Sequence, residues 1–262
     1  MAIRIRDVSF SYGDKAVLAH ISLHAPEGNL CVLLGPNGSG KSTLLKVMAG
    51  AVRGAQGRIE FHGHDAATLR GEDRARMIGY LPQFHQAVFP FTVEQVVLTG
   101  RAAYVTAMPK PDDREAAIEA INTVGIEHLR LRPYTEISGG ERQLVMIARV
   151  LAQKPRIILL DEPVSHLDLA NQIWLLGLLH ALTRSGITVL AVLHDPNIAM
   201  LYGDAFFFLK QGSLITPTDG TAPWEGDFLS HIYGACLESI PHRGKALFVP
   251  DMENGDNAHG AV

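Results

Sequence analysis

The chain has 262 residues, of which 47% are hydrophobic and 19% charged, and its formal net charge is -4 at pH 7. This composition supports a sizeable buried core and excludes an intrinsically disordered chain. The modest negative charge gives no reason to expect a nucleic-acid partner, because phosphates favour a basic protein surface. The two cysteines argue against a disulfide framework. We find neither a signal peptide nor an apolar run near the roughly 20 residues of a spanning helix, so we expect any membrane role to come through association.

The first quarter of the chain is predicted to form strands around a glycine-rich loop. Residues 2–10 and 16–25 are bounded by turns and are typical of strands. The continuous apolar run 30–34 is typical of a strand that is buried on both faces. The loop that follows leads into a helix predicted at 43–49, and a short strand is expected at 58–61.

The middle of the chain is predicted to be helical. A Thr-x-x-Gln capping box at 92–95 indicates the start of one helix. Acidic residues at one end and a glycine at the other delimit a second helix at 112–124. The stretch 104–111 between them is irregular, and a further amphipathic helix is expected at 139–152. We interpret this block as an insertion into the surrounding fold.

Strands and helices alternate in the last third of the chain. Strands are predicted at 157–160, 188–193 and 205–209, and helices at 169–183 and 197–202. This alternation indicates an α/β protein with a parallel sheet.

A phosphate-binding loop is indicated by residues 35–42, which read Gly-Pro-Asn-Gly-Ser-Gly-Lys-Ser and fit the pattern G-x-x-x-x-G-K-[ST]. Glycines between a buried strand and a helix let backbone N–H groups turn toward phosphate oxygens. Lys41 would supply a positive charge to the outer phosphates, and Ser42 a hydroxyl ligand to Mg²⁺. The alternative, an ordinary glycine-rich turn with a surface lysine, fits this context poorly. The loop indicates a nucleoside triphosphate but does not distinguish a kinase, a GTPase and a transport ATPase.

A carboxylate pair, Asp161 and Glu162, follows another buried strand. Open α/β sheets bind ligands at the carboxyl ends of their strands. Asp161 there can orient Mg²⁺, and Glu162, which points another way, can act as a base on a water molecule. A pair of solvated acids is the common alternative, and the phosphate loop weakens it.

Residues 137–143 read Ile-Ser-Gly-Gly-Glu-Arg-Gln and begin the helix predicted at 139–152. Ser138 can cap this helix, and Glu141 completes a capping box. Capping does not explain two consecutive glycines, which are poor helix formers. The glycines leave backbone N–H groups exposed, which predicts a second anion site on a different helix from the first.

The order of these motifs resembles that of ABC-transporter ATPases over nearly the whole chain. The positions that carry the resemblance are 35–42, Gln83 in Leu-Pro-Gln, 138–142, Asp161-Glu162, 165–168 and His194. The resemblance implies a P-loop NTPase core with a mostly parallel sheet, an N-terminal antiparallel β subdomain and an inserted helical subdomain. It implies one ABC ATPase domain over residues 1–240, in which the helical subdomain covers about 88–152. The C-terminal extension, 241–262, is expected to be partly flexible.

The resemblance also implies that two copies pack head to tail, with ATP and Mg²⁺ between the phosphate loop of one copy and the signature of the other. In such a site Glu162 would be the base, His194 would hold the γ-phosphate, and Gln83 would sense Mg²⁺ and the attacking water. Asp168 would couple the two sites. The implied ATP-binding residues are Tyr12 on the adenine, Gly35, Pro36, Asn37, Gly38, Ser39, Gly40, Lys41, Ser42 and Thr43. The implied contacts from the second copy are Ser138, Gly139, Gly140 and Glu141, and the implied Mg²⁺ residues are Ser42, Gln83 and Asp161.

Three departures from the family pattern are visible. The signature opens with Ile137 where leucine is usual, and it has Glu141 where glutamine is frequent. Neither change removes a backbone donor. His166 replaces a commoner small residue before Asp168, which would either alter communication between the sites or be neutral.

A finer resemblance is to importers of metal chelates, namely ferric siderophores, haem and cobalamin, with a related branch for molybdate. The segments that carry it are Leu98 to Arg101, Leu167 to Gln172, Ile232 to Gly234 and Phe248 to Pro250. It implies transmembrane permease subunits that contact residues 83–110, a periplasmic or surface solute-binding protein, and a peripheral location on the cytoplasmic face of the inner membrane. The alternatives are a soluble ABC ATPase outside transport and an ATPase for another solute such as molybdate.

Overall fold

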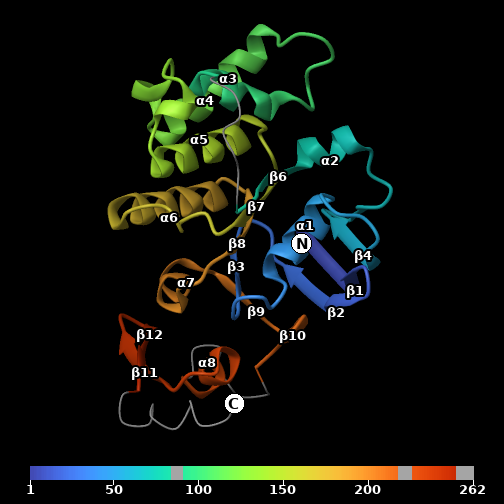
Figure 1. Ribbon diagram of the computed structural model, residues 1–262, viewed down its shortest axis with the longest axis vertical. Helices are drawn as coiled ribbons and strands as arrows, with labels where there is room; N and C mark the ends of the chain where they lie inside the picture. The colour runs from blue at the N-terminus through green and yellow to red at the C-terminus, as the bar shows by residue number, and fades with distance from the viewer. Residues whose placement is uncertain (84–90, 218–225, 252–262) are drawn as a thin grey trace.

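A computed structural model describes residues 1–83, 91–217 and 226–251. Within these residues, six strands form one sheet in the order β10–β9–β3–β8–β7–β6 (Figure 1). Every neighbouring pair is parallel except β9 and β10. The predicted core with a mostly parallel sheet is therefore confirmed. The strands are β3 (Leu30–Leu34), β6 (Ile78–Leu81), β7 (Ile157–Asp161), β8 (Thr188–Val192), β9 (Ala205–Lys210) and β10 (Ser213–Ile215).

The register of the parallel strands brings four carboxyl ends to one edge of the sheet. Leu33 of β3 and Asp161 of β7 both pair with Val192 of β8. Leu81 of β6 pairs with Leu160 of β7. The segments that follow these strands therefore leave the sheet side by side, at the edge where open α/β sheets bind ligands.

Both faces of this sheet are covered, which explains the nearly continuous apolar sequences of β3, β7 and β8. Val32 belongs to a core cluster with residues of α6 and α7, whereas Leu33 belongs to a second cluster with residues of α1. Figure 1 shows α1 on one side of the sheet and α6 and α7 on the other. The helices are α1 (Lys41–Ala49), α6 (Leu169–Arg184) and α7 (Pro196–Tyr202).

The second cluster extends into an antiparallel sheet near the N-terminus, with the strand order β2–β1–β4–β5. Its side chains, which include Ile5 and Phe61, belong to the same cluster as Leu44 and Met48 of α1. The predicted antiparallel β subdomain is thus confirmed, and it fixes α1 from the side opposite the large sheet. The strands are β1 (Ile3–Tyr12), β2 (Lys15–Ala25), β4 (Gln56–Phe61) and β5 (His64–Asp65).

Helices between β6 and β7 form a separate layer at one end of the molecule (Figure 1). Val97, Ile121 and Val145, from three of these helices, share the first core cluster. The predicted capping box begins the first helix. The side chain of Thr92 accepts a hydrogen bond from the backbone N–H of Gln95, and the side chain of Gln95 accepts one from the backbone N–H of Thr92. The elements are α3 (Val93–Leu98), η1 (Thr99–Arg101), α4 (Pro111–Val124), η2 (Glu127–Leu129), η3 (Tyr134–Glu136) and α5 (Gly139–Ala152).

Two regions contain elements that the sequence patterns do not predict. The first consists of α2 (Gly71–Met77) and of β6, into which α2 runs directly. The second is C-terminal and consists of α8 (Gly226–Tyr233) and a hairpin of β11 (Leu237–His242) and β12 (Lys245–Pro250). The hairpin is fixed to α7 by Asn197, which exchanges hydrogen bonds of 3.0 and 2.6 Å with the backbone of Phe248. The division expected after residue 240 falls inside β11.

The longest helix in the described ranges is α6, with 16 residues. None of the helices in those ranges combines the length and the apolar character needed to cross a bilayer.

Candidate active site

The predicted phosphate loop connects β3 to α1, and two of its glycines are sterically required. Gly35 has a φ of 144°, and a Cβ there would lie 2.0 Å from the carbonyl oxygen of Leu209 in β9. Gly40 has a φ of 107°, and its Cβ would lie 2.9 Å from the side chain of Leu18 in β2. The loop is therefore pressed between two sheets, and its backbone curls ahead of the first turn of α1, as anion binding at a helix N-terminus requires.

Lys41 folds back over this loop. Its ammonium donates to the carbonyl oxygens of Gly35 and Pro36, at 2.7 and 2.8 Å. Burial lowers the pKa of Lys41, and the nearby carboxylates of Glu162 and Asp161 oppose that shift. The cation is thus held where the loop and the carboxylate pair meet.

Asp161 ends β7 in contact with the start of α1. The hydroxyl of Ser42 donates to its Oδ1 at 2.9 Å, while Oδ2 is buried with no hydrogen-bond partner in the described ranges. Burial raises the pKa of Asp161, and the Ser42 hydrogen bond opposes the rise. A hydroxyl beside a carboxylate with an unsatisfied oxygen is a donor set that fits a hard divalent cation such as Mg²⁺.

Glu162 and His194 form a second pair at the same edge. His194 Nε2 lies 2.6 Å from Glu162 Oε1, and the Glu162 side chain is only 11% exposed. Glu162 has a φ of 55°, a left-handed conformation that turns its carboxylate away from the direction of the strand. The structure therefore gives the two adjacent acids different partners, Ser42 for Asp161 and His194 for Glu162.

Gln83 and Tyr12 lie at the ends of their strands. Gln83 follows β6 by two residues, and β6 pairs with β7, so Gln83 emerges beside the end of the Asp161 strand. The segment after Gln83, residues 84–90, lies outside the described residues. Tyr12 ends β1, packs edge to face on Phe10 with ring centroids 4.8 Å apart, and is 47% exposed. Its ring is open to a stacking partner.

The signature turn begins α5 with the predicted capping box. The backbone N–H of Glu141 donates to Ser138 Oγ at 3.2 Å, and that of Ser138 donates to Glu141 Oε2 at 2.7 Å. These bonds to Ser138 lower the pKa of Glu141. A Cβ on Gly139 would meet no atom within 4 Å, so this face of the turn is open.

The signature turn is not joined to the phosphate loop of its own chain by any hydrogen bond or ion pair in the described residues. Its neighbour is the loop before α6, because a Cβ on Gly140 would lie 3.4 Å from the carbonyl oxygen of His166. That loop ends at Asp168, whose side chain caps α6 by accepting from the N–H of Asn171 at 2.8 Å. Two turns with the features of anion sites, on separate parts of one chain, fit a site that is shared between two copies.

Two further residues contact the site and were not predicted from the sequence. Buried Gln143, one turn into α5, donates to the carbonyl oxygen of Pro163 at 2.9 Å and ties the signature helix to the loop after Glu162. Tyr233 in α8 lies near Gly35, and burial raises its pKa to about 12 although the Gly35 backbone opposes the rise. Its hydroxyl is buried and has no hydrogen-bond partner in the described residues. Gln143 is the last residue of the signature run 137–143, so this motif offers a weak signal for its role. No local pattern links Tyr233 to a loop almost 200 residues earlier in the chain.

The fold and these residues define a P-loop NTPase. The chain matches the family model described as ABC transporter over residues 18–165. It belongs to that family and is an ABC ATPase, which binds and hydrolyses ATP.

Relatives and solved structures resemble the chain well beyond the matched range. The hemin import ATP-binding protein HmuV of Bordetella avium is 37% identical, with 94% of this chain and 97% of the relative covered. HmuV of Vibrio cholerae is also 37% identical, with 95% and 98% covered. An inward-facing structure assigned to a metal-chelate type ABC transporter matches with a TM-score of 0.80 and 30% identity, and covers 95% of this chain and 97% of its own. A dimeric bacterial ABC transporter cassette matches with a TM-score of 0.73 and 29% identity, with 82% and 97% covered.

Proposed function

We propose that this ATPase energises the import of a metal-chelate-type solute, such as a ferric siderophore, haem or cobalamin, across the cytoplasmic membrane. The observation that carries the proposal is that the hemin import relatives align over 94–95% of the chain. The alignment therefore extends past residues 18–165, the range common to the wider family, into the C-terminal helix and hairpin. We propose a single ABC ATPase domain with a helical subdomain at about 88–152. The end of this ATPase domain, expected after residue 240, moves beyond the hairpin of β11 and β12, which spans that position.

In the proposed site, the phosphate loop and Thr43 hold the triphosphate and Tyr12 stacks on the adenine. Ser42 and Asp161 would hold Mg²⁺, with Gln83 close to it, and the ion would offset the negative charge of the reacting phosphates. Glu162 accepts a proton from the attacking water, and His194 orients Glu162 and contacts the γ-phosphate.

The second half of each site comes from another copy of the chain in this proposal. Ser138, Gly139 and Gly140 of that copy bind the γ-phosphate, with Glu141 capping their turn. Asp168 couples the two sites. The open face of Gly139 and the separation of the signature from its own phosphate loop support a head-to-tail dimer.

A cleft of about 800 Å³ is the proposed surface for the permease subunits. It lies where the antiparallel sheet, α1 and α2 meet the helical layer, and its walls include Arg53, Arg74, Thr99, Gly100 and Arg149. The segment 99–104 belongs to the region that the sequence assigns to the permease contact. The chain would sit peripherally on the cytoplasmic face of the inner membrane, and an importer also implies a solute-binding protein outside it.

The experiment is affinity purification of the tagged chain from detergent-solubilised native membranes. We expect a multi-spanning membrane protein to co-purify, and uptake of haem or of another metal chelate to depend on the chain. Lys41→Ala is the matched control, because it removes the charge on the phosphates but leaves the cleft intact. It should retain the membrane protein and lose uptake. Enrichment of ribosomes or DNA in place of a membrane protein would contradict the proposal.

A further inference from the structure

One wall of the cleft is formed by residues 99, 100, 102 and 103, and this segment is fixed to the last turn of α5. Gly100 lies directly on this turn, because a Cβ there would be 2.1 Å from the carbonyl oxygen of Arg149. The Arg149 side chain also contacts this segment, because its Nε donates a hydrogen bond to Thr99 Oγ1 at 2.9 Å. The wall and the end of the helix therefore cannot move independently.

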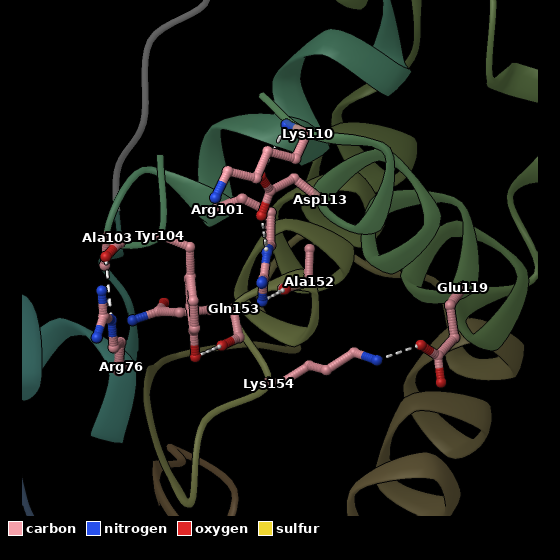
Figure 2. A network of polar contacts seen from close by, with 10 residues as sticks. All are labelled: Arg76, Arg101, Ala103, Tyr104, Lys110, Asp113, Glu119, Ala152, Gln153 and Lys154. Carbon is pink, nitrogen blue, oxygen red and sulfur yellow. Dashed lines mark hydrogen bonds and ion pairs between the residues drawn. The ribbon is translucent and has the colours of Figure 1, made fainter. Parts of the chain in front are cut away.

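Arg101 is the centre of this attachment, as Figure 2 shows. Its guanidinium donates to the carbonyl oxygen of Ala152 at 3.1 Å and to Oδ1 of Asp113 at 3.0 Å. It also lies 3.6 Å from the ring centroid of Tyr104. Arg101 and Asp113 are 8% and 3% exposed, so the charges are buried together. A cation on the last carbonyls of α5 also interacts favourably with the helix dipole.

Tyr104, which Figure 2 shows beside Arg101 and bonded to Gln153, extends the network toward β6. The Tyr104 hydroxyl donates to the carbonyl oxygen of Gln153 at 3.0 Å. The amide of Gln153 donates to the carbonyl oxygens of Ala75 and Ile78, the latter at 2.8 Å. Because β6 leads to Gln83, the same turn of α5 is connected to the end of the strand beside the Asp161 strand.

α5 joins this attachment to the signature turn. The helix has 14 residues, which makes it about 20 Å long, with Ser138 capping one end and Gln153 at the other. A regular helix transmits a displacement of one end to the other because its backbone is hydrogen-bonded throughout. Gln143 in its second turn reaches the loop after Glu162, so the helix is fixed near both ends.

We propose that Arg101 is a positioning residue that couples the cleft wall to ATP-driven closure of the dimer, by fixing the direction in which α5 presents the signature turn. The inference rests on the proposed shared site. It adds a structural connection, through Arg101 and α5, from the permease-facing cleft to the signature turn that would bind the γ-phosphate. Lysine could keep the charge beside Asp113, but it lacks the planar fork that reaches Asp113 and Ala152 together and the flat face that stacks on Tyr104. Arg101→Lys therefore changes the attachment and keeps the charge.

The test uses the full chain with ATP as the probe, in a Glu162→Gln background that should hold the ATP-bound dimer. Arg101→Lys in this background should leave the affinity of the monomer for a fluorescent ATP analogue unchanged. The dissociation constant of the ATP-bound dimer should rise about tenfold or more, measured by sedimentation velocity. A variant that merely weakened the fold would lose ATP affinity as well.

Two companion variants keep the test decisive. Glu119→Gln removes the charge from the Lys154–Glu119 ion pair of 2.7 Å, which joins α4 to the residue two positions after the end of α5 and is more than half exposed. This variant should leave dimerisation unchanged. Tyr104→Phe removes only the hydroxyl bond to Gln153, and it should weaken the dimer in the same sense as Arg101→Lys.

Unchanged dimerisation in Arg101→Lys and Tyr104→Phe would overturn the inference and leave the proposed site intact. If the Glu162→Gln chain itself did not dimerise with ATP, the shared site would be wrong, and the inference would fail with it.

Discussion

At the residue scale, the backbone of Glu162 separates two acids that are adjacent in the sequence. Asp161 closes a strand and keeps its direction, so its carboxylate reaches Ser42. Glu162 adopts a φ of 55°, which is unfavourable for a residue with a Cβ and places its carboxylate on His194. In the proposed site, the 2.6 Å contact with His194 would position Glu162 for proton transfer, and the end of the strand would position Asp161 for a cation.

We expect Glu162→Gln to bind ATP with unchanged affinity and to lose turnover by a factor of about 10²–10⁴, because an amide cannot accept the proton of the attacking water. Equilibrium binding measures the ATP affinity, and phosphate release measures the turnover. Because ATP then persists, the variant should elute as a dimer with ATP and as a monomer without it. Hydrolysis at the wild-type rate would exclude Glu162 as the base.

Asp161→Asn should separate stability from activity. Burial raises the pKa of Asp161 above its unfolded value, so its contribution to folding is present below the unfolded pKa and is lost as the pH rises through the folded pKa. A neutral amide should therefore raise the melting temperature at neutral pH, and the difference should vanish in acid, where the aspartate is protonated. Mg²⁺-dependent hydrolysis should be lost. A melting temperature that falls at neutral pH would show that the charge stabilises this fold.

At the scale of elements, two helices begin with the same device and serve different purposes. Thr92–Gln95 opens α3, and Ser138–Glu141 opens α5. The two glycines that follow Ser138 distinguish the second box, because they lower helix propensity and expose N–H groups. Capping explains the residues that the two boxes share, and the proposed anion site would explain the glycines.

Thr92→Ala and Ser138→Ala provide a matched comparison. Each should lower the free energy of unfolding by about 1 kcal/mol, because each removes an acceptor for a helix N–H. Only Ser138→Ala should also lower ATP turnover, by about tenfold, since its hydroxyl would contact the γ-phosphate of the partner copy. Chemical denaturation and phosphate release measure the two effects. Equal turnover in both variants would show that Ser138 acts only as a helix cap.

The elements that the sequence did not predict are those with weak local signals. β6 has four residues and contains Gly79, which lies against Val150 and Pro155 with no room for a side chain. β11 carries Pro241 and is largely exposed, so it shows no alternating pattern. Pairing with β7 stabilises β6, and pairing with β12 stabilises β11. Both strands depend on contacts that are distant in the sequence.

At the scale of the whole molecule, no hydrogen bond or ion pair within the described residues joins the phosphate loop of the chain to its own signature turn. We therefore expect the ATPase activity per molecule to rise with protein concentration, since in the proposed dimer one monomer supplies only half of each site. The measurement is the initial rate over about a hundredfold range of dilution. Glu162→Gln, which should not turn over, supplies the background. A specific activity that does not change on dilution would indicate a complete site in one monomer.

The sequence by itself determined the class of protein, a P-loop NTPase. Glycines and a lysine at fixed spacing predict the phosphate loop, and continuous apolar runs predict the buried strands. The sequence also determined both capping boxes, which depend on residues within one helical turn. Only the tertiary structure decided which groups meet: Ser42 with Asp161, His194 with Glu162, and Arg101 with Asp113 and the last turn of α5. The reason is physical. A local motif fixes its own backbone, whereas contacts between distant segments follow from strand order and from the packing of helices on the sheet, which no single stretch of sequence encodes.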